Sequence, residues 1–485
     1  MDAPHVELAV IGGGITGLGV ARLAARNGIG VVVMDRGDLA SGASSSTSHM
    51  LHGGLRYLEH GHFPLVREAL AERAALRRMA PELARPTRFL IPFYAGDRRP
   101  PWVVRAGLTL YDALAGRANL SPHTMVGARD ALALEPDLEP RGLRGAALYS
   151  DAVMDDSRLA VAVARDAARH GAEIYTYTAM VGARPARDGA VELIARDTID
   201  GSERRWVARA VINAAGPWAD AVRTTLSRGL RPGAPDPARL LRPTRGTHLV
   251  YPALTRGHGL LLFARSDGRV FFLVPFADHT LVGTTEVETS SPPAAGDAGP
   301  SHEEIAYLRD ELARILPRPA GQPVLALTAG LRPLLGASGE VRGVSREHRV
   351  VEDGPLITVV GGKYTTFRVM ARDALERAKS RLGRAAQRLL DPVDPLPRPF
   401  DLDATSVEGL AETAAADGFA RRVEDVVRRR STLWVSPDRG RVAASAVATA
   451  LARRFQWTPE RTRDEIDAYH VVLERERALL EGAHE

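Results

Sequence analysis

Hydroxyl and glycine residues crowd into one stretch of the chain, SSSTSHMLHGGLRYLEHG, which spans residues 44–61. Hydroxyl side chains donate and accept hydrogen bonds without adding charge, and glycine lets a backbone lie close to a ligand. The same composition is typical of a solvated surface loop. The stretch alone leaves both interpretations open, and the residues before it decide between them.

A glycine-rich turn lies between a predicted strand and a predicted helix near the start of the chain. Residues 6–11 are an apolar run typical of a buried parallel strand, and residues 18–26 have a helical pattern. Between them, Gly12 allows a tight turn, Gly14 lets the backbone approach a pyrophosphate, and Gly17 lets helix and strand pack closely. Glycine-rich turns are common, so this motif alone is a weak signal.

Asp35 strengthens the interpretation. It follows a second apolar run, residues 31–34, at a strand end where a carboxylate can accept hydrogen bonds from ribose hydroxyls. An aspartate in such a place is otherwise a turn former or a helix cap. Together with the glycine turn, Asp35 predicts an adenine dinucleotide.

Length and composition limit the number of domains, the class of protein and the chemistry that the chain can perform. A chain of 485 residues is predicted to form two or three domains, because a single compact core does not grow this large. Hydrophobic residues at 45% and charged residues at 25% are typical of a globular protein. Cysteine is absent, which excludes disulfides, a thiol nucleophile, an iron–sulfur cluster and a cysteinyl flavin link.

The formal net charge of +5 raises the question of a nucleic-acid partner. The arginines are interleaved with acids, and aromatic residues make up only 5%, so stacking platforms are scarce and no nucleic-acid partner is predicted. No apolar run approaches the roughly 18 residues of a spanning helix. The first strand begins at Val6, which leaves no room for a signal peptide. The sequence therefore predicts a cytoplasmic protein, in solution or on a membrane surface.

The predicted elements change character along the chain. Helix 159–170 precedes strand 172–177, as in a parallel sheet. Between residues 225 and 325, strand-like runs are separated by Gly, Pro and Asp, which favours an antiparallel sheet. Beyond the Pro-rich linker 392–399 the pattern is helical. The predicted fold class is α/β, with a Rossmann-like dinucleotide domain, an antiparallel-sheet substrate domain and a C-terminal all-helical domain.

Eight motifs, taken in order, resemble those of the FAD-dependent (aerobic-type) glycerol-3-phosphate dehydrogenases, a branch of the flavin oxidoreductases related to D-amino-acid oxidase. The likeness covers nearly the whole chain. Its more specific parts are HGGLRYLE and GGKYTTFR in this order, followed by a helical extension. The motifs are VIGGGITGLGVA (10–21), SSSTSHMLHGGLRYLEHG (44–61), INAAGPWAD (212–220), TRGTHLVYP (244–252), VGTTEVE (282–288), TAGLRPLL (328–335), GGKYTTFRVMA (361–371) and VEDVVRRRSTLW (423–434).

The resemblance implies FAD as the cofactor and gives the opening stretch a purpose, since in this family the hydroxyl-rich segment passes along the flavin. This chain departs from the family at His49, where lysine is usual, and at Asp35, where glutamate is usual. The implied cofactor-binding residues are Gly12, Gly14, Thr16, Gly17, Asp35, Ser44, Ser45, Ser46, Ser48, His52, Gly53, Gly54, Ala215, Gly216, Gly362 and Thr365.

The same resemblance implies how the domains alternate along the chain. The FAD-binding domain comprises residues 1–93, 151–222 and 325–378, the substrate domain comprises 94–150 and 223–324, and the helical domain comprises 392–485.

The implied reaction oxidises the secondary alcohol of sn-glycerol 3-phosphate to dihydroxyacetone phosphate, with hydride transfer to flavin N5 and electrons passed to a quinone. Such a site must hold a phosphate, stabilise a developing alkoxide and provide a base. The implied residues are Arg56, Tyr57 and Arg346 for substrate binding and His248, Arg332 and Lys363 for catalysis, with no metal.

Two of these residues are candidates for the base. Arginine stays protonated, whereas the ordinary histidine pKa of about 6.5 suits His248 to proton transfer. Lys363 with a lowered pKa is the competing candidate. Most arginines in a chain so rich in arginine are solvated surface charges, and a histidine on a strand more often has a structural role. Only the motifs around them therefore identify the arginines and His248 as candidate site residues.

Several alternatives stay open at this point. A related flavin enzyme acting on an amino acid or another 2-hydroxy acid has similar motifs, although the extra cations favour phosphate. A glycerol-3-phosphate oxidase that uses oxygen and a non-catalytic flavin-binding module are two more. The partners expected are a small phosphorylated substrate, a quinone and an anionic membrane surface, and a homodimer is left open. A basic amphipathic helix predicted over 369–390 is the expected anchor on the inner face of the cytoplasmic membrane.

Overall fold

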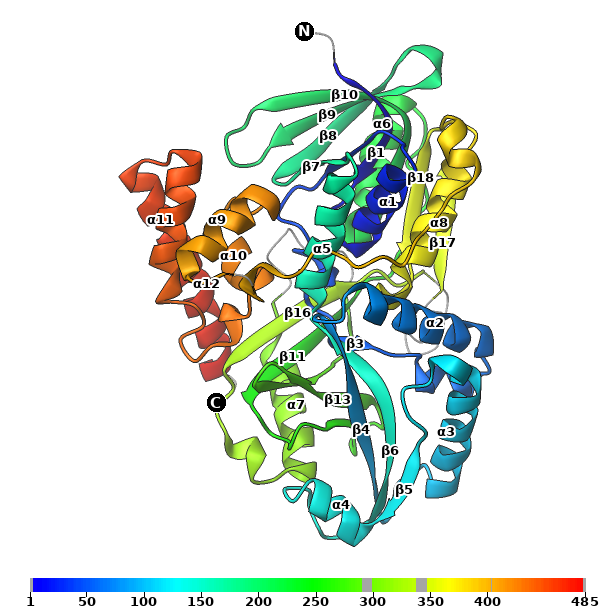
Figure 1. Cartoon of the computed structure of the whole chain (residues 1–485), viewed down its shortest axis with the longest axis vertical. Helices are drawn as coiled ribbons and strands as arrows, with labels where there is room; N and C mark the ends of the chain where they lie inside the picture. The colour runs from blue at the N-terminus through cyan, green and yellow to red at the C-terminus, as the bar shows by residue number, and fades with distance from the viewer. Residues whose placement is uncertain (1–2, 290–298, 337–346, 403, 483–485) are drawn as a thin grey trace.

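Two β-sheets lie one above the other along the long axis of the molecule, with a group of helices beside them (Figure 1). The computed structural model describes residues 3–289, 299–336, 347–402 and 404–482. Within these residues the upper sheet has eight strands and the lower sheet has ten. The predicted α/β class, with its antiparallel second sheet and helical C-terminal part, is confirmed.

The first, upper sheet is mainly parallel. Its strands are β1 (His5–Ile11), β2 (Val31–Met34), β7 (Glu173–Tyr175), β8 (Thr178–Pro185), β9 (Val191–Asp197), β10 (Glu203–Asn213), β17 (His348–Asp353) and β18 (Leu356–Gly361). β1 lies between β2 and β10 and is parallel to both. Leu8 and Val10 pack into one hydrophobic layer, while Ala9 and Ile11 pack into the layer on the opposite face. Burial on both faces explains why this strand is an uninterrupted apolar run.

Helices cover both faces of this sheet. Those packed together on one face are α1 (Ile15–Arg26), α5 (Asp156–Arg169) and α8 (Phe367–Ala378), and α6 (Ala219–Leu230) lies against β8. α5 begins at Asp156, three residues before the predicted start, because the Asp155 side chain accepts a hydrogen bond from the backbone N–H of Arg158 at 3.0 Å. The βαβ connections bring the carboxyl ends of the parallel strands to one edge, toward the second sheet.

The second sheet is almost wholly antiparallel. Its strands are β3 (Met50–Leu51), β4 (Ala84–Tyr94), β5 (Thr124–Gly127), β6 (Leu143–Met154), β11 (Thr244–Pro252), β12 (Gly259–Phe263), β13 (Val270–Phe276), β14 (His279–Gly283), β15 (Val287–Glu288) and β16 (Ala326–Arg332). Only the β4–β12 pair is parallel among the described strands of this sheet. β4 belongs to this second sheet, although residues 1–93 were expected to form part of the FAD-binding domain with the first sheet. The predicted division of the chain into domains remains a prediction.

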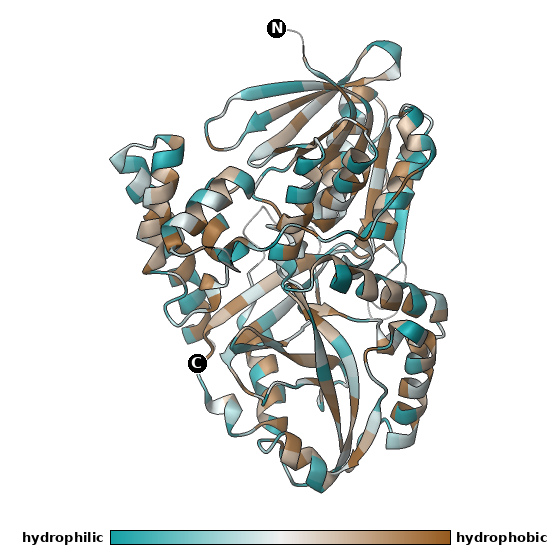
Figure 2. Cartoon of the chain, in the orientation of Figure 1, coloured by the Kyte–Doolittle hydropathy of each residue, from teal (hydrophilic) through white to brown (hydrophobic). Residues whose placement is uncertain are grey.

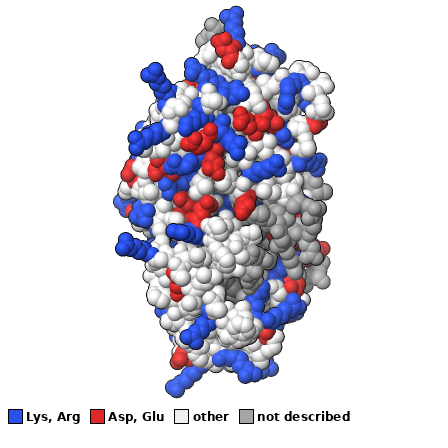
Figure 3. All heavy atoms as spheres, turned by 90° about the vertical axis from the view of Figure 1, so that its right-hand side faces the viewer, with Lys and Arg blue, Asp and Glu red and all other residues white. Residues whose placement is uncertain are grey.

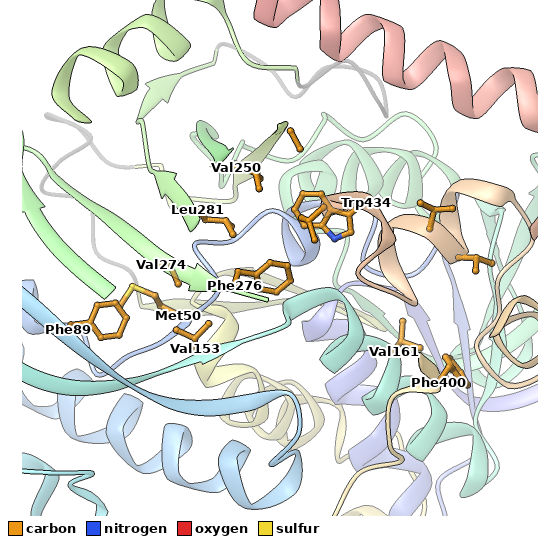
Figure 4. Close-up of a cluster of buried hydrophobic side chains, with 14 of the residues drawn as sticks. Met50, Phe89, Val153, Val161, Val250, Val274, Phe276, Leu281, Phe400 and Trp434 are labelled. Carbon is orange, nitrogen blue, oxygen red and sulfur yellow. The ribbon is translucent and has the colours of Figure 1, made fainter. Parts of the chain in front are cut away.

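Two groups of helices complete the molecule. Around the second sheet lie α2 (Phe63–Met79), α3 (Pro101–Ala115), α4 (Ala128–Leu134) and α7 (His302–Ile315), and the C-terminal group is α9 (Val407–Asp417), α10 (Val423–Arg429), α11 (Ala443–Phe455) and α12 (Pro459–Glu481). Figure 4 shows Trp434 of the C-terminal part beside Phe276 of β13, with ring centroids 6.0 Å apart. One hydrophobic core therefore continues from the second sheet into the C-terminal helices.

A buried cluster of charges attaches the C-terminal helices to the first sheet. We call Asp38, Asp425, Arg429 and Arg430 the interdomain cluster. Both arginines donate to Asp38, with Arg430 Nη2 2.6 Å from its Oδ1, and Arg429 Nη2 lies 2.8 Å from Asp425 Oδ1. The hydroxyl of Tyr177, close to β7, donates to Asp425 at 2.7 Å. All four cluster residues are buried, so each charge depends on the others for compensation.

The helix predicted over 369–390 as a membrane anchor is wrong in two respects. α8 ends at Ala378, and a short 3₁₀ turn at 384–387 follows instead of further α-helix. The apolar side chains of this segment, including Leu375, Leu382 and Leu389, are buried in the core of the first sheet. They are therefore not available to lipid. Among the described residues, no helix is both long and apolar enough to cross a membrane.

Candidate functional site

The turn between β1 and α1 and the first turn of α1 each contain a glycine with no room for a side chain. Gly12 has a φ of +111°, and a Cβ there would lie 2.5 Å from the carbonyl oxygen of Ala214. A Cβ on Gly17 would lie 2.0 Å from the carbonyl oxygen of Gly12. Gly14 is the N-cap of α1 and offers it no side-chain acceptor. The helix therefore starts with backbone donors and partial positive charge that suit a pyrophosphate.

Asp35 lies directly after β2, where the sequence places it. Its two carboxylate oxygens accept hydrogen bonds from the backbone N–H groups of Gly13 at 2.6 Å and Gly37 at 2.8 Å. Burial raises the pKa of Asp35, and these two amides oppose the rise. A carboxylate has about four lone-pair sites, so this one can still accept from ribose hydroxyls while it holds the turn.

The hydroxyl-rich segment runs between the two sheets. Ser44 Oγ accepts a hydrogen bond from the backbone N–H of Ile15, the first residue of α1, at 3.0 Å. Four residues later, Ser48 Oγ lies 2.8 Å from Nε2 of His248 on β11. The segment therefore joins the glycine turn of the first sheet to a titratable group of the second sheet, which is not the arrangement of a solvated loop.

These elements surround a cleft of about 520 Å³ whose walls come from both sheets. Most residues predicted for the site lie along it, although their motifs are scattered over more than 350 positions. The predicted residues that line the cleft are Gly12, Gly14, Thr16, Asp35, Ser44, Ser46, Ser48, His52, Tyr57, Ala215, Gly216, His248, Arg332, Gly362, Lys363 and Thr365.

The remaining predicted residues do not line the cleft or lie outside the description. Gly17, Ser45, Gly53 and Gly54 are not among the residues that line the cleft. Arg346 lies outside the described residues. Arg56 is placed only by its backbone, in the 3₁₀ turn η2 (Leu55–His60), and its side chain also lies outside the description.

His248 lies between β14 and β16 and is 2% exposed. Nε2 contacts Ser48, and no described group lies within hydrogen-bond reach of the buried Nδ1. Burial, helped by the charge of Arg332 and by His49, lowers the pKa of His248 to about 3. The imidazole is therefore neutral at neutral pH, which is the form that accepts a proton. The ordinary histidine pKa assumed from the sequence does not apply here.

Two cations lie on the walls of the cleft, and one of them, Arg332, is close enough to His248 to lower its pKa. Arg332, at the end of β16, donates to Thr284 Oγ1 at 2.7 Å and to the carbonyl oxygen of Thr285 at 3.2 Å. The Nζ of Lys363, after β18, lies 3.8 Å from the centroid of the Tyr57 ring. A cation over a ring face is stabilised in its charged form. Both side chains therefore offer positive charge to the cleft from different strands.

Sequence reasoning missed a buried network behind the His52–Gly54 loop. The backbone N–H of Gly53 donates to the Tyr111 hydroxyl at 2.7 Å, and this hydroxyl donates to Asp151 at 2.9 Å. Asp151 also accepts from Arg73 Nη1 at 2.6 Å. Burial raises the pKa of Asp151 to about 6, although Arg73 opposes the rise. No local signal marks these residues, because they come from α2, α3 and β6 and meet only after folding.

Two further cleft residues had a weak signal in the sequence. The guanidinium of Arg36 lies 4.3 Å from the ring centroid of Trp218, and both side chains line the cleft. Arg36 follows Asp35, and Trp218 stands in the motif INAAGPWAD. Their positions in or beside recognised motifs could have identified them.

His49, where the family usually has lysine, lies behind the cleft. Its φ is +53°, its Nδ1 lies 3.0 Å from the carbonyl oxygen of Met154, and its ring centroid is 4.3 Å from that of Phe276. Because Phe276 also contacts Trp434, the histidine is part of the packing that joins the C-terminal helices to the hydroxyl-rich segment.

Comparison with known protein families now decides the identity of the site. The family described as FAD dependent oxidoreductase matches residues 7–366. The chain belongs to this family. Its cofactor is FAD, and the crowded glycines, the glycine N-cap of α1 and the carboxylate of Asp35 all fit a dinucleotide.

Individual members of the family are similar over most of the chain. A glycerol-3-phosphate dehydrogenase of Pseudomonas aeruginosa is 38% identical over 377 residues, which cover 76% of this chain and 70% of that protein. A D-erythritol 1-phosphate dehydrogenase of Brucella abortus is 38% identical over 382 residues, covering 77% and 73%. The solved structure of a Bacillus halodurans glycerol-3-phosphate dehydrogenase complexed with FAD aligns with a TM-score of 0.72 at 22% identity, over 96% of this chain and 94% of that one. At 22% identity, the similarity to the Bacillus halodurans structure shows that the two chains share a fold.

Proposed function

We propose that the protein oxidises sn-glycerol 3-phosphate to dihydroxyacetone phosphate and passes the electrons to a quinone at a membrane surface. The observation that carries this proposal is the meeting of neutral His248 with Arg332 and Lys363 in a cleft that also contains the dinucleotide turn. The Pseudomonas relative, a glycerol-3-phosphate dehydrogenase, supports the choice of substrate.

The two cations have the charge needed to bind the substrate phosphate. A phosphate monoester carries about two negative charges near neutral pH. Arg332 and Lys363 reach the cleft from β16 and from the segment after β18, so they can contact one anion from two sides. A single carboxylate needs only one such partner, which favours a phosphorylated substrate over an amino acid or a simple hydroxy acid.

His248 is the proposed base. Its neutral imidazole accepts the proton of the substrate hydroxyl, and a bound phosphate dianion favours the resulting imidazolium against the effects of burial and Arg332. Bound FAD supplies the acceptor for the hydride. Because the Nζ of Lys363 lies over the face of the Tyr57 ring, where a positive charge is stabilised, we assign Lys363 to substrate binding rather than to proton removal.

An anaerobic substrate screen followed by flavin absorbance tests the proposal. Glycerol 3-phosphate should bleach the yellow holoenzyme within one turnover, whereas glycerol, glycine and lactate should not. Unbleached flavin with glycerol 3-phosphate would contradict the proposed substrate. Bleaching by glycine or lactate instead would favour the related enzymes on amino acids or hydroxy acids.

A four-carbon polyol phosphate is the second candidate substrate, because the D-erythritol 1-phosphate dehydrogenase is as similar to this chain as the Pseudomonas enzyme. D-erythritol 1-phosphate therefore belongs in the same screen. A larger kcat/KM for it than for glycerol 3-phosphate would change the substrate assignment but not the roles of His248, Arg332 and Lys363.

The electron acceptor and the attachment of FAD need separate measurements. Turnover with a soluble quinone but little hydrogen peroxide in air is expected, and rapid peroxide formation would mean an oxidase. Because the chain contains no cysteine, we expect non-covalent FAD. Acid precipitation should release it to the supernatant, and yellow colour left in the pellet would indicate attachment through another side chain.

A further inference from the structure

Two glutamates of α7 are buried, which is unusual for this side chain. Figure 3 shows acidic side chains at the surface of one face of the molecule, interspersed with lysine and arginine. Glu304 and Glu311, in contrast, are 4% and 2% exposed. Figure 2 shows that hydrophobic and hydrophilic residues alternate along α7, and both glutamates belong to its buried side. A glutamate is almost never fully buried unless it is paired, so the partners of these two show what each one does.

Glu304 joins the start of α7 to the second sheet. Its Oε1 accepts hydrogen bonds from Thr285 Oγ1 at 2.6 Å and from Thr247 Oγ1 at 3.1 Å. Its Oε2 lies 2.7 Å from Nη2 of Arg245 and accepts from the backbone N–H of Ser301 at 3.0 Å. The contact with Ser301 belongs to the capping box of α7. The other three reach β11 and the segment between β14 and β15, so this side chain does more than cap its own helix.

The guanidinium of Arg332 is held by the backbone of the same two segments. Its Nη1 donates to the carbonyl oxygens of Thr285 at 3.2 Å and Arg245 at 3.4 Å, and its Nη2 donates to Thr284 Oγ1 at 2.7 Å. The guanidinium lies directly against β11, since a Cβ on Gly246 would be 2.1 Å from Nη2. The direction of Arg332 therefore depends on how β11 and the Thr284–Thr285 segment are placed relative to each other.

We propose that Glu304 is a positioning residue, which directs Arg332 toward the substrate phosphate by fixing Arg245 and Thr285. Glu304 is not among the residues that line the cleft, so it acts through Arg332 rather than on the substrate. Thr247 directly precedes His248, so the same side chain also fixes the backbone of β11 beside the proposed base. This inference deepens the proposed function and rests on it, because it takes Arg332 as a ligand of a phosphorylated substrate.

Glu311 offers a matched comparison on the same helix. Its side-chain oxygens accept hydrogen bonds from the backbone N–H groups of Arg265 at 2.8 Å and Ser266 at 3.2 Å, and from Arg314 Nη1 at 3.2 Å. These three residues do not line the cleft. The two glutamates therefore share a helix and a degree of burial, but only Glu304 is connected to a residue of the cleft.

The same substitution at both positions tests the proposal in the intact holoenzyme. Glu304→Gln and Glu311→Gln keep the size of the side chain but replace one acceptor oxygen with an NH2 group, which donates. Both should lower the midpoint of denaturant unfolding, because each loses a buried acceptor. Only Glu304→Gln should raise KM for glycerol 3-phosphate, by about tenfold and with a smaller change in kcat, because a misdirected cation weakens substrate binding. The amount of bound FAD should be the same in both.

A double-mutant cycle with Arg332→Met separates positioning from a general loss of structure. Once the guanidinium is gone there is nothing for Glu304 to direct, so adding Glu304→Gln should change kcat/KM by less than about twofold. A similar tenfold loss in both backgrounds would overturn the proposal. A wild-type KM in Glu304→Gln would also overturn it, as would an equal rise of KM in Glu311→Gln.

A second pair of variants covers the case in which Glu304→Gln does not retain FAD. Thr285→Val keeps the shape of the side chain but removes the hydroxyl that donates to Glu304 and accepts from the backbone N–H of Thr247 at 2.9 Å. Thr285→Ser keeps that hydroxyl. KM should rise in Thr285→Val and return close to the wild-type value in Thr285→Ser, and equal KM values in the two would contradict the proposal.

The wild-type protein distinguishes a failure of this inference from a failure of the proposed function. If glycerol 3-phosphate does not reduce the wild-type flavin, the proposed substrate is wrong, and the positioning role that depends on it is wrong as well. If the wild type is reduced and the variants at Glu304 and Thr285 keep its KM, only the role of Glu304 is wrong.

Discussion

The cleft around His248 and the interdomain cluster both bury polar and charged side chains, but they differ in how completely these are partnered. In the interdomain cluster, Asp38 and Asp425 each accept hydrogen bonds from buried arginines. In the cleft, the buried Nδ1 of His248 has no partner among the described residues. Buried polar atoms in folded proteins are normally paired, so an unpaired one beside a cleft indicates a place for a ligand, whereas a paired set indicates structure.

The buried histidine of the cleft and the buried Asp38 of the interdomain cluster are held in opposite states of ionisation. It lowers the pKa of His248 to about 3, and the nearby cation Arg332 acts in the same direction. Burial would raise the pKa of Asp38, but Arg430 and Arg429 outweigh it and hold this pKa below its ordinary value. The cleft therefore keeps its histidine uncharged, while in the interdomain cluster the two arginines keep Asp38 ionised.

The largest expected effect is on the chemistry of the cleft. In His248→Asn the flavin should stay bound, but its anaerobic reduction by substrate should slow by about 10²- to 10⁴-fold, because the proton acceptor is lost. Partial recovery at high pH is expected, where hydroxide can take the proton. His279→Asn, a partly buried histidine at the start of β14, serves as the matched control and should reduce at the wild-type rate. An unchanged rate in His248→Asn would transfer the role of base to Lys363.

Arg430→Met should affect stability rather than chemistry. Removing one partner leaves Asp38 with less compensation for its buried charge, so the free energy of unfolding should fall by about 3–5 kcal/mol. Denaturant unfolding measures the loss, and single-turnover reduction of the remaining folded holoenzyme should be normal. Arg441→Met, which breaks an exposed pair with Glu474, should cost no more than about 1 kcal/mol. Equal losses of unfolding free energy in the two variants would show that the buried pair contributes no more to stability than the exposed pair.

Lys363→Met and Arg332→Met should each lower kcat/KM for glycerol 3-phosphate while FAD stays bound. A lost charged hydrogen bond to the substrate costs about 1.5–3 kcal/mol, or roughly 10- to 150-fold in kcat/KM. Lys379→Met is the matched control, because Lys379 pairs with Glu376 on the surface. Wild-type kcat/KM in either cleft variant would mean that the corresponding cation does not bind the substrate.

The smallest expected effect is a pH dependence of stability. Burial, then the charge of Asp38, raises the pKa of Asp425 to about 6, so the folded state holds this proton more tightly than the unfolded chain does. The contribution of Asp425 to stability is therefore greatest below about pH 4 and declines as the pH rises to about 6. The difference in unfolding free energy between wild type and Asp425→Asn should change over this window by about 1–3 kcal/mol. A difference that is constant with pH would show that Asp425 is ionised throughout.

Much of the first sheet and its cofactor site could be predicted, because the relevant information lies within short spans of sequence. The apolar run of β1, the three glycines of the turn and Asp35 fall within the first 35 residues, and backbone sterics dictate what such a sequence can do. The helix predicted over 159–170 is also present, as most of α5 (Asp156–Arg169).

The prediction for 369–390 failed because periodicity does not tell which surface an apolar stripe contacts. Leu375, Leu382 and Leu389 keep helical spacing in the sequence, yet the helix stops at Ala378 and these side chains complete the core of the first sheet.

By itself, the sequence predicted a bound dinucleotide, because glycines and an acid at fixed local spacing suffice for that, and its eight motifs resembled those of a family of flavin oxidoreductases. Tertiary structure alone decided that His248 contacts Ser48 across 200 positions and that its imidazole is neutral. It also decided that Tyr111 holds Gly53 and that Asp38 is neutralised by arginines nearly 400 positions away. These properties depend on burial and on which distant side chains meet, and both are set by the packing of the whole chain rather than by neighbours in sequence.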